Sequence, residues 1–526
     1  MSVLTPQYAC GPLSGPAGSR QKDSRGTVRG GTATAPAVAE RPVNIVPIGE
    51  HRWKRKPFAH QLEAFNRGAR RSKFMFLMEQ GTGKTDVMAN AVAWHHVNRR
   101  IYRVLVVAPL SVIPSWLEVL EASFAPAYRA HWLEGASAKK LQALEDGLRE
   151  SADESDPNRP CTFFFINYQA IARLEPDLAR ICADAIILDE SQNIKNHRAK
   201  TTLALVRLRK NARFRYVGTG TLITQDAYDA FSQCAWTNPG ILGHRRITTF
   251  RAEFVSRYHP VFKAKVVEWK NLEALGARIA EHSFRVLKSE CLDLPPKLYQ
   301  KRLVNLSPEQ KRVYNDVATE FAAELDCGTV ISADHLLSRL TKLAQITGGF
   351  LRNEDGGSIE LKPNAKLAEL MEICDGLDTK AKAIIWCRFT DEINCIVAAL
   401  NKKYGAGSAV AYYGGTPGPE RGRIVRRFQD EEHPRWFVGQ PAAGGAGITL
   451  TRATYAIYYS NSYRLEHRLQ SEDRCHRLGT SSQVTYIDLL ARDTMDAYIL
   501  KLLKLKKSLA DVVNRDDIRA MLKPLR

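Results

Sequence analysis

Short apolar runs alternate with amphipathic stretches along most of this 526-residue chain. Each run of the first series has the length of a buried strand, and apolar residues at helical spacing fill the stretches between them. The runs of this series are 73–78, 104–108, 162–166, 185–190 and 214–218. Such alternation is typical of a parallel sheet with helices on both faces. We therefore predict a first α/β lobe over residues 51–235.

A second series of runs has the same pattern and predicts a second α/β lobe over residues 366–526. Its runs are 383–387, 409–413, 435–439, 455–459 and 484–490. Over residues 236–365 helical patterns dominate, so we assign this stretch to helical insertions and an inter-lobe linker, in which LDLPPK interrupts any helix. Residues 1–50, rich in Gly, Ser, Ala, Pro and Thr, are typical of a disordered tail.

The segment MEQGTGKT directly follows the first predicted strand and opens a predicted helix. A glycine-rich loop lets backbone N–H groups surround phosphate oxygens, and the helix N-terminus adds its partial positive charge. In this arrangement Lys84 reaches the β- and γ-phosphates of a nucleotide, and the Thr85 hydroxyl binds Mg²⁺. Met78 stands where the usual pattern opens with glycine, and a plain glycine-rich turn is the alternative. The other phosphate-binding candidates are Gly81, Thr82 and Gly83.

Two further polar segments end later strands, at the edge where ligands of parallel sheets gather. In ILDES, Asp189 is a candidate Mg²⁺ ligand and Glu190 a candidate base for the attacking water. An acidic pair that merely caps a helix is the alternative. In VGTGT, Thr219, Gly220 and Thr221 are candidates for sensing the γ-phosphate, against the alternative of a simple left-handed turn.

The segment QSEDRCHRLGT carries Gln470, Asp473, Arg474 and Arg477 at spacings that place all four on one face of a helix. Two arginines on one face are either ordinary solvated surface or a site for a phosphate. Because nothing nearby in the sequence supplies that phosphate, the second interpretation requires a partner elsewhere in the chain.

Taken in order, these motifs resemble helicase superfamily two and, within it, the Swi/Snf-type DNA-dependent ATPases. In PFAHQLEAF, Gln61 matches the residue that reads adenine, and SFRVLKSECLDLPPKLY is similar to the inter-lobe stretch typical of Swi/Snf-type proteins. Further segments in family order are VLVVAPLSVIPSWLEVL, DESQNIKN, NPGILG, KAIIWCRFTDEI, YYGGTPGPERGRIVRRF and AAGGAGITLT. The resemblance implies two RecA-like doubly wound lobes, ATP and Mg²⁺ as cofactors, and a nucleic-acid partner.

The resemblance also implies roles for residues of the second lobe. Arg474 and Arg477 resemble the arginine fingers that this lobe directs at ATP bound to the first lobe, and Gln470 resembles the glutamine of the same motif. Since neither lobe alone then holds a complete site, hydrolysis would require the lobes to close. The residues implied in coupling ATP to closure are Gln192, Thr219, Gly220, Thr221, Gly445 and Gly447.

Three positions depart from the family's pattern. Gln192 stands where the family has His, and it can hydrogen-bond but cannot ionise. Leu222 replaces a preferred Pro, and Ala442 stands where Arg is common, which weakens one expected nucleic-acid contact. Because Lys84, the acidic pair and the two arginines are all present, we predict an active nucleic-acid-stimulated ATPase.

The charge balance favours a polyanionic partner. Lys and Arg number 76 against 56 Asp and Glu, a formal net charge of +20. This excess suits nucleic acid, with a membrane surface or plain solubility as the alternative. We expect double-stranded DNA, gripped through its backbone. The basic candidates, each of which could instead belong to a solvated helix face, are Lys195, Arg198, Arg421, Arg423, Arg426 and Arg427.

Cysteine usage and hydropathy bear on the compartment. The ten cysteines form no CxxC pair, so neither a zinc site nor a compact disulfide framework is indicated, and we expect a reducing compartment. No apolar run approaches transmembrane length. We expect a monomer without a membrane partner, in the cytoplasm of a bacterium or virus-infected cell, or in the nucleus of a eukaryote.

Three functions remain open from the sequence. The first is a translocase on duplex DNA that acts in replication, recombination or repair without necessarily separating strands, and the Swi/Snf-type linker favours it. The second is a strand-separating helicase on DNA or RNA, which needs a wedge or hairpin that the sequence does not reveal. The third is a nucleic-acid-binding scaffold whose ATP site only switches conformation.

Overall fold

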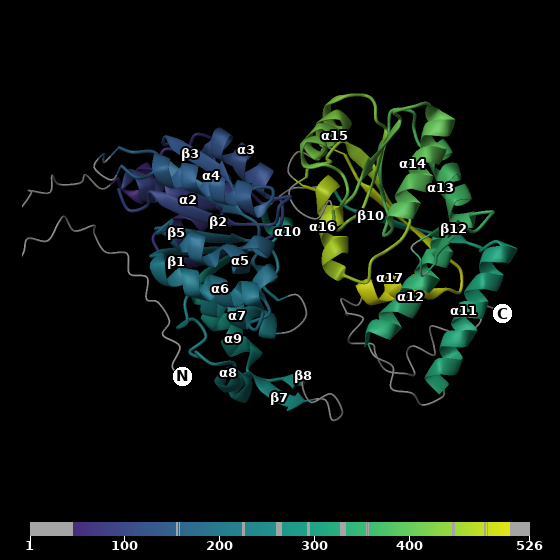
Figure 1. The fold of residues 1–526 in the computed structure, drawn as a ribbon, viewed down its shortest axis with the longest axis horizontal. Helices are drawn as coiled ribbons and strands as arrows, with labels where there is room; N and C mark the ends of the chain where they lie inside the picture. The colour runs from purple at the N-terminus through teal and green to yellow at the C-terminus, as the bar shows by residue number, and fades with distance from the viewer. Residues whose placement is uncertain are drawn as a thin grey trace, which may run out of the picture.

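Two α/β lobes form the body of the molecule, as the two series of apolar runs predict. Figure 1 shows them side by side, the first coloured purple to teal and the second green to yellow. The computed structural model describes residues 46–153, 156, 158–223, 227–258, 266–291, 295–326, 333–353, 355, 357–443, 448–477, 480 and 482–504.

The first lobe contains a seven-stranded sheet in the order β3-β4-β2-β5-β6-β1-β9. All its strand pairs are parallel, which confirms the predicted architecture. Because every strand points the same way, the loops that leave β1, β5 and β6 meet at one edge of the sheet. The strands are β1 (Lys73–Met78), β2 (Arg103–Val107), β3 (Tyr128–Trp132), β4 (Cys161–Ile166), β5 (Ala185–Asp189), β6 (Phe214–Gly218) and β9 (Ser283–Val286).

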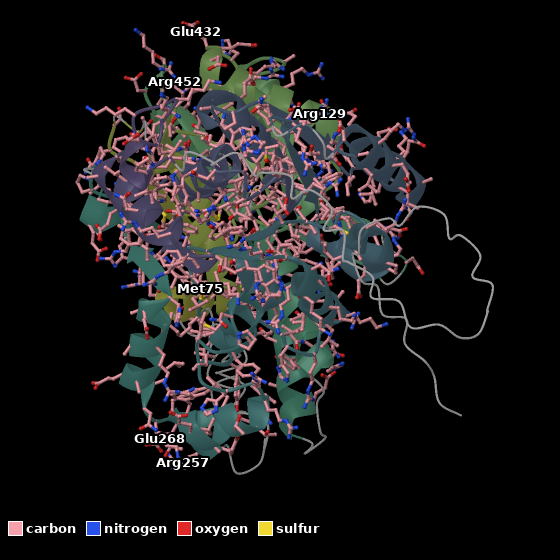
Figure 2. All side chains as sticks on the ribbon, turned by 90° about the vertical axis from the view of Figure 1, so that its left-hand side faces the viewer. Met75, Arg129, Arg257, Glu268, Glu432 and Arg452 are labelled. Carbon is pink, nitrogen blue, oxygen red and sulfur yellow. The ribbon has the colours of Figure 1, made fainter. Side chains whose placement is uncertain are left out.

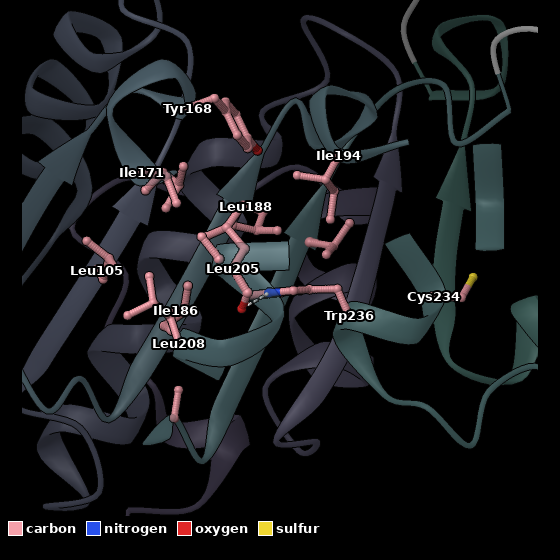
Figure 3. Close-up of a cluster of buried hydrophobic side chains, with 14 of the residues drawn as sticks. Leu105, Tyr168, Ile171, Ile186, Leu188, Ile194, Leu205, Leu208, Cys234 and Trp236 are labelled. Atoms are coloured by element: carbon pink, nitrogen blue, oxygen red, sulfur yellow. Dashed lines mark hydrogen bonds between the residues drawn. The ribbon is translucent and has the colours of Figure 1, made fainter. Parts of the chain in front are cut away.

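Helices cover this sheet, and two large clusters of buried apolar side chains fill the space between the layers. In one cluster the Trp236 indole N–H donates to the Leu205 carbonyl at 3.0 Å, so the polar atom of this buried ring is satisfied (Figure 3). The helices are α1 (Ala59–Gly68), α2 (Lys84–Val97), α3 (Ile113–Ser123), α4 (Ser137–Glu150), α5 (Tyr168–Ala179), α6 (Lys200–Leu208), α7 (Tyr228–Thr237), α8 (Ile247–Phe254) and α9 (Leu272–Glu281).

The second lobe contains a six-stranded parallel sheet in the order β10-β17-β16-β13-β15-β14. Its strands are β10 (Leu298–Val304), β13 (Lys382–Trp386), β14 (Ala409–Tyr412), β15 (Trp436–Gly439), β16 (Ala453–Tyr458) and β17 (Thr485–Ala491). Its helices are α11 (Pro308–Asp326), α12 (Ala333–Gly348), α13 (Ala365–Gly376), α14 (Thr390–Tyr404), α15 (Gly418–Asp430), α16 (Leu465–Cys475) and α17 (Met495–Lys504). In the part of the chain that the structure describes, no helix is both long and apolar enough to span a membrane.

The stretch 236–365 differs from the expected helical insertions. It supplies β9 and β10, which complete the two sheets, with the short helix α10 (Lys288–Cys291) between them. β10 is an edge strand whose side chains are mostly exposed, so it lacks the apolar run by which buried strands are recognised. The stretch also forms two antiparallel hairpins, β7 (Val255–Tyr258) with β8 (Val266–Trp269), and β11 (Phe350–Arg352) with β12 (Ser358–Glu360).

The N-terminal segment predicted as a tail divides into two parts. Residues 1–45 lie outside the described residues. Residues 46–50 lie against α2: the Val46 N–H donates to Asn98 Oδ1 at 2.8 Å, and the Trp94 indole donates to the Val46 carbonyl at 3.0 Å. The described chain is therefore fixed to the first lobe from its first residue.

A buried carboxyl caps α14 in the second lobe. Glu392 is 2% exposed, and its Oε2 accepts hydrogen bonds from the backbone N–H groups of Arg388 and Phe389, both at 3.0 Å, and from the Ser460 hydroxyl at 2.6 Å. Burial raises the pKa of Glu392 from 4.5 to about 7, against the opposing attraction of Lys366. The carboxyl is therefore half protonated near neutral pH.

We expect Glu392 to make the second lobe less stable as the pH rises. Between its unfolded pKa of 4.5 and its folded pKa of about 7, the unfolded state loses the proton first, so each step up in pH favours unfolding. Glu392→Gln lacks this penalty, and its free energy of unfolding relative to the native protein should rise between pH 5 and pH 8. Urea unfolding at pH 5 and at pH 8 measures this difference in the free energy of unfolding. The exposed Glu431→Gln is the control, and an unchanged difference would contradict the expectation.

Candidate active site

The phosphate loop joins β1 to α2 at the carboxyl edge of the first sheet, as predicted. Gly81 and Gly83 have φ angles of 83° and 84°, a left-handed conformation that glycine adopts without strain. A Cβ atom on Gly83 would lie 1.8 Å from Gln61 Nε2, so a larger residue there would have to displace the Gln61 side chain. The loop ends with Lys84 as the first residue of α2, and the backbone N–H groups of this helix start face the loop.

Gln61 and His60 of α1 hold the loop from the side. Gln61 Nε2 donates to the Thr82 carbonyl at 3.2 Å, and Gln61 Oε1 accepts the Phe58 N–H at 3.0 Å. His60 Nε2 also lies 2.8 Å from the Thr82 carbonyl. The structure thus places Gln61 beside the loop, while its reading of adenine stays a prediction.

The predicted acidic pair meets the loop lysine. Lys84 Nζ lies 3.2 Å from Glu190 Oε1 and 3.4 Å from Asp189 Oδ1, and all three side chains are buried. The Trp116 indole N–H donates to Asp189 Oδ2 at 2.9 Å and fixes this carboxylate. Glu190 has a φ angle of 51°, a strained value for a residue other than glycine that is common at functional sites.

Electrostatics keep Lys84 and Glu190 charged, whereas at Asp189 burial outweighs the attraction of Lys84 and raises the pKa of the carboxyl. Burial lowers the pKa of Lys84, but attraction to Glu190 and Asp189 outweighs it and raises the pKa above its ordinary value. Burial also works against the charged form of Glu190, yet Lys84 and the hydrogen bond from Gln192 hold the pKa of this carboxyl below its usual range. Glu190 is therefore a carboxylate that can accept a proton.

Three of the six predicted coupling residues, Gln192, Thr219 and Thr221, belong to a continuous hydrogen-bond chain. The Thr219 hydroxyl donates to Gln192 Oε1 at 2.9 Å, and Gln192 Nε2 donates to Glu190 Oε2 at 2.9 Å and to Glu466 Oε1 at 3.3 Å. The Thr221 N–H donates back to the Thr219 hydroxyl oxygen at 3.1 Å. Gln192, which departs from the family's His, thus uses its amide to join carboxylates of both lobes.

Gly220 lies directly over the phosphate loop, since a Cβ atom there would be 3.3 Å from the backbone nitrogen of Gln80. Leu222, the second departure, is a buried core side chain that is 9% exposed. The two glycines predicted to couple the lobes, Gly445 and Gly447, lie outside the described residues.

Helix α16 brings the arginines of the second lobe to the loop, with one difference from the expected geometry. The helix ends at Cys475, so Arg477 follows it and does not share the helical face of Gln470 and Arg474. Gln470 Nε2 donates to Glu466 Oε1 at 3.2 Å. The spacing of Gln470, Arg474 and Arg477 predicted a helix that continues past Cys475, because the sequence carries no cap signal at that point.

Both arginines nevertheless reach the first lobe. Arg477 Cβ lies 3.1 Å from the position that a Cβ on Gly81 would take, and Arg477 Nη1 donates to Thr449 Oγ1 at 2.9 Å. Arg474 is 4% exposed; burial and the charge of Arg477 lower its pKa to about 10, while Glu190 attracts it. The guanidinium group therefore remains charged at neutral pH, and the catalytic candidate of the other lobe attracts it.

Sequence reasoning missed several residues of this site. Gln80 Nε2 donates to Glu190 Oε1 at 3.3 Å, Trp116 holds Asp189, and Glu466 receives the amides of Gln192 and Gln470. Glu466 lies 274 positions from Gln192 in sequence, and no local pattern joins two such residues. Trp116 lies in VLVVAPLSVIPSWLEVL, a segment recognised only by its place in the family order, so its contact with Asp189 was not evident.

Several of the basic candidates have partners within the chain. Arg421 Nε donates to the Thr416 carbonyl at 2.9 Å and its Nη2 to the Gly414 carbonyl at 2.9 Å. Arg423 lies 3.6 Å from Glu420, and Arg427 lies 3.3 Å from Glu431. These contacts are typical of a solvated helix face. Contacts of nucleic acid with Lys195, Arg198, Arg421, Arg423, Arg426 and Arg427 stay predictions.

Among the described residues no group of three or more His, Cys, Asp or Glu side chains could hold a metal ion. Mg²⁺ does not need such a group, because it commonly binds one or two carboxylates together with nucleotide phosphates and water. Asp189 at the end of β5 and the half-buried Thr85 at the start of α2 supply a carboxylate and a hydroxyl of the kind that Mg²⁺ takes. The donor set therefore fits a nucleotide-borne magnesium ion.

Comparison with known proteins matches both lobes. The SNF2-related domain matches residues 61–348, and the helicase conserved C-terminal domain matches residues 365–479. An uncharacterised ATP-dependent helicase of Mycoplasma genitalium is 24% identical over 446 residues, which cover 84% of this chain and 40% of the relative. A helicase/translocase of Bacillus subtilis is 25% identical, over 83% of this chain and 46% of the relative. The chain thus spans less than half the length of these relatives.

A solved structure of similar sequence is the SWI2/SNF2 ATPase core of Sulfolobus solfataricus in complex with double-stranded DNA. It is 24% identical, the match covers 92% of this chain and 100% of that chain, and the TM-score is 0.41.

The hydrogen bonds of Glu466 predict that this residue stabilises contact between the lobes. Glu466→Ala removes the acceptor of the Gln192 amide, and a hydrogen bond to a charged group contributes about 1.5 kcal/mol. We expect the ratio of closed to open molecules to fall about tenfold. Dyes at Glu432 and Arg257, which lie at opposite ends of the molecule in Figure 2, would report this change by energy transfer.

The matched control is Glu420→Ala, since Glu420 is an exposed acid on α15 of the same lobe. Equal energy-transfer distributions for native protein and Glu466→Ala would contradict the expectation.

Proposed function

Because the chain belongs to the SNF2-related domain family, we propose that it is an ATP-driven motor that hydrolyses ATP between its two lobes while gripping nucleic acid. The observation that carries this proposal is the meeting of two half-sites. The phosphate loop of the first lobe lies next to Arg477 of the second, since a Cβ atom on Gly81 would be 3.1 Å from Arg477 Cβ, and the charge of Glu190 attracts Arg474.

Each residue has a chemical task in this proposal. The phosphate loop binds the nucleotide phosphates, and Lys84 leaves its carboxylate partners to pair with them. Glu190 accepts the proton of the attacking water. Arg474 and Arg477 stabilise the charge that develops on the γ-phosphoryl oxygens, and such an arginine contributes a factor of about 10³ or more in rate. Asp189 and Thr85 would hold Mg²⁺, which neutralises phosphate charge when bound.

The partner that we propose is double-stranded DNA, bound through its backbone. The net charge of +20 supports a polyanionic partner, and a sequence-independent grip suits a motor that moves along a strand. Relatives named as ATP-dependent helicases of bacteria support a nucleic-acid motor. We propose a monomer acting in DNA replication, recombination or repair in a bacterial or virus-infected cytoplasm.

A second candidate function is strand separation, and one observation favours it. The β7–β8 hairpin projects from the far end of the first lobe (Figure 1), and it exposes Tyr258 and Val267, which are 38% and 47% exposed. The sequence alone did not reveal this hairpin. A hairpin with exposed apolar side chains could wedge a fork, whereas a translocase does not need one.

Steady-state ATP hydrolysis without nucleic acid and with single-stranded DNA, duplex DNA or RNA tests the proposal. We expect duplex DNA to stimulate hydrolysis most strongly. Glu190→Gln and Arg477→Ala should each lower kcat by about 10³-fold, because they remove the base and a charge-stabilising group from opposite lobes.

Stimulation by single strands or RNA alone, together with displacement of a labelled strand from a fork, would favour the strand-separating function. No hydrolysis under any condition would reject the motor and favour an ATP-switched scaffold.

A further inference from the structure

Lys288 contacts both lobes from the inter-lobe linker. It opens the short helix α10, which Figure 1 shows between the lobes next to α16. Its backbone N–H donates to Glu79 Oε2 at 2.7 Å in the phosphate-loop segment. Its ammonium group donates to Asp473 Oδ1 at 2.5 Å and to the His476 carbonyl at 3.1 Å in the second lobe.

The Lys288 side chain also lines the phosphate loop. A Cβ atom on Gly81 would lie 3.3 Å from Lys288 Cε and 3.1 Å from Arg477 Cβ. The side chains of Lys288 and Asp473 are 8% and 13% exposed. A buried ammonium needs a partner, because an unpaired buried charge is strongly unfavourable. While loop, linker and α16 are together, each of these two buried charges therefore depends on the other.

The second linker lysine provides a contrast. Lys297 Nζ lies 2.9 Å from Glu472 Oε2, the residue next to Asp473, and its side chain is 26% exposed. Lys297 immediately precedes β10, and β10 belongs to the second sheet. The ion pair of Lys297 thus joins α16 to a strand of its own lobe, whereas the contacts of Lys288 join α16 to the phosphate-loop segment of the other lobe.

We propose that Lys288 is a positioning residue that aligns Arg474 and Arg477 with the phosphate loop when the lobes close. It acts through Asp473, which precedes Arg474, and through the carbonyl of His476, which precedes Arg477. This inference rests on the proposed ATPase function. It assigns to the linker a part in hydrolysis in addition to joining the lobes.

The test compares Lys288→Met, Asp473→Asn, the double variant of these two, and Lys297→Met as the matched control. Duplex-stimulated kcat is measured at saturating ATP, and affinity is measured with a fluorescent ATP analogue. We expect Lys288→Met to lower kcat by about tenfold or more, since small misalignments have effects of this order. ATP affinity should stay within about threefold, because Lys84 and the loop are intact.

The double variant separates alignment from folding. Asp473 also attracts Arg474 and Arg477, so the double variant is compared with Asp473→Asn, in which these attractions are equally absent. The double variant no longer buries the Lys288 ammonium without its partner, so its thermal midpoint should lie above that of Asp473→Asn. Its kcat should be at least as low as that of Lys288→Met, because both variants lack the Lys288 contact. Lys297→Met should keep kcat within about threefold of native.

Several outcomes would overturn this role of Lys288. One is a kcat within about threefold of native for Lys288→Met or for the double variant. Others are a loss of ATP affinity equal to the loss of kcat, or an equal loss of kcat in Lys297→Met. A native protein that hydrolyses no ATP would instead reject the proposed function itself.

Discussion

A lysine buried between two carboxylates is the interaction on which the site depends. Lys84 lies within 3.4 Å of both Asp189 and Glu190, and a buried charge of either sign would be unfavourable without the other. Three parallel strands must end at one edge of the sheet to bring the phosphate loop, the acidic pair and the Thr219 segment together. The apolar packing of the first lobe holds the strands that end at that edge in place.

This cluster also explains how nucleotide binding could alter the molecule. Lys84 serves as the counter-ion of the acidic pair, and in the function proposed above nucleotide phosphates compete for the same ammonium group. Once Lys84 turns to a phosphate, Glu190 keeps the Gln192 amide and lies near the charge of Arg474. In the proposed cycle, nucleotide binding to the first lobe thus takes Lys84 away from Glu190 and strengthens the attraction of Glu190 for Arg474 of the second lobe. This is a physical reason for closure to follow binding.

The sequence predicted the parts of the fold whose cause is local. Buried parallel strands are continuous apolar runs, and both sheets were recognised from them. The phosphate loop and acidic pair were recognised because their chemistry requires particular residues next to a strand end. Edge strands such as β10 lack that signal, since one side of an edge strand meets solvent. Contacts across the linker lack it also: Lys288 and Asp473 are 185 positions apart, and nothing in the motif of either residue points to the other.

The contacts that join the two half-sites are polar, and this property matters for a cycling motor. Gln192 with Glu466, Lys288 with Asp473, and Arg477 beside the phosphate loop are hydrogen bonds, an ion pair and a close backbone approach. An extended apolar interface would hold the lobes together permanently. When the lobes separate, the polar groups replace their hydrogen bonds to each other by hydrogen bonds to water. Their net contribution to the free energy of closure is therefore small. In the proposed motor the same interface therefore forms for hydrolysis and opens for product release, with the nucleotide deciding the balance.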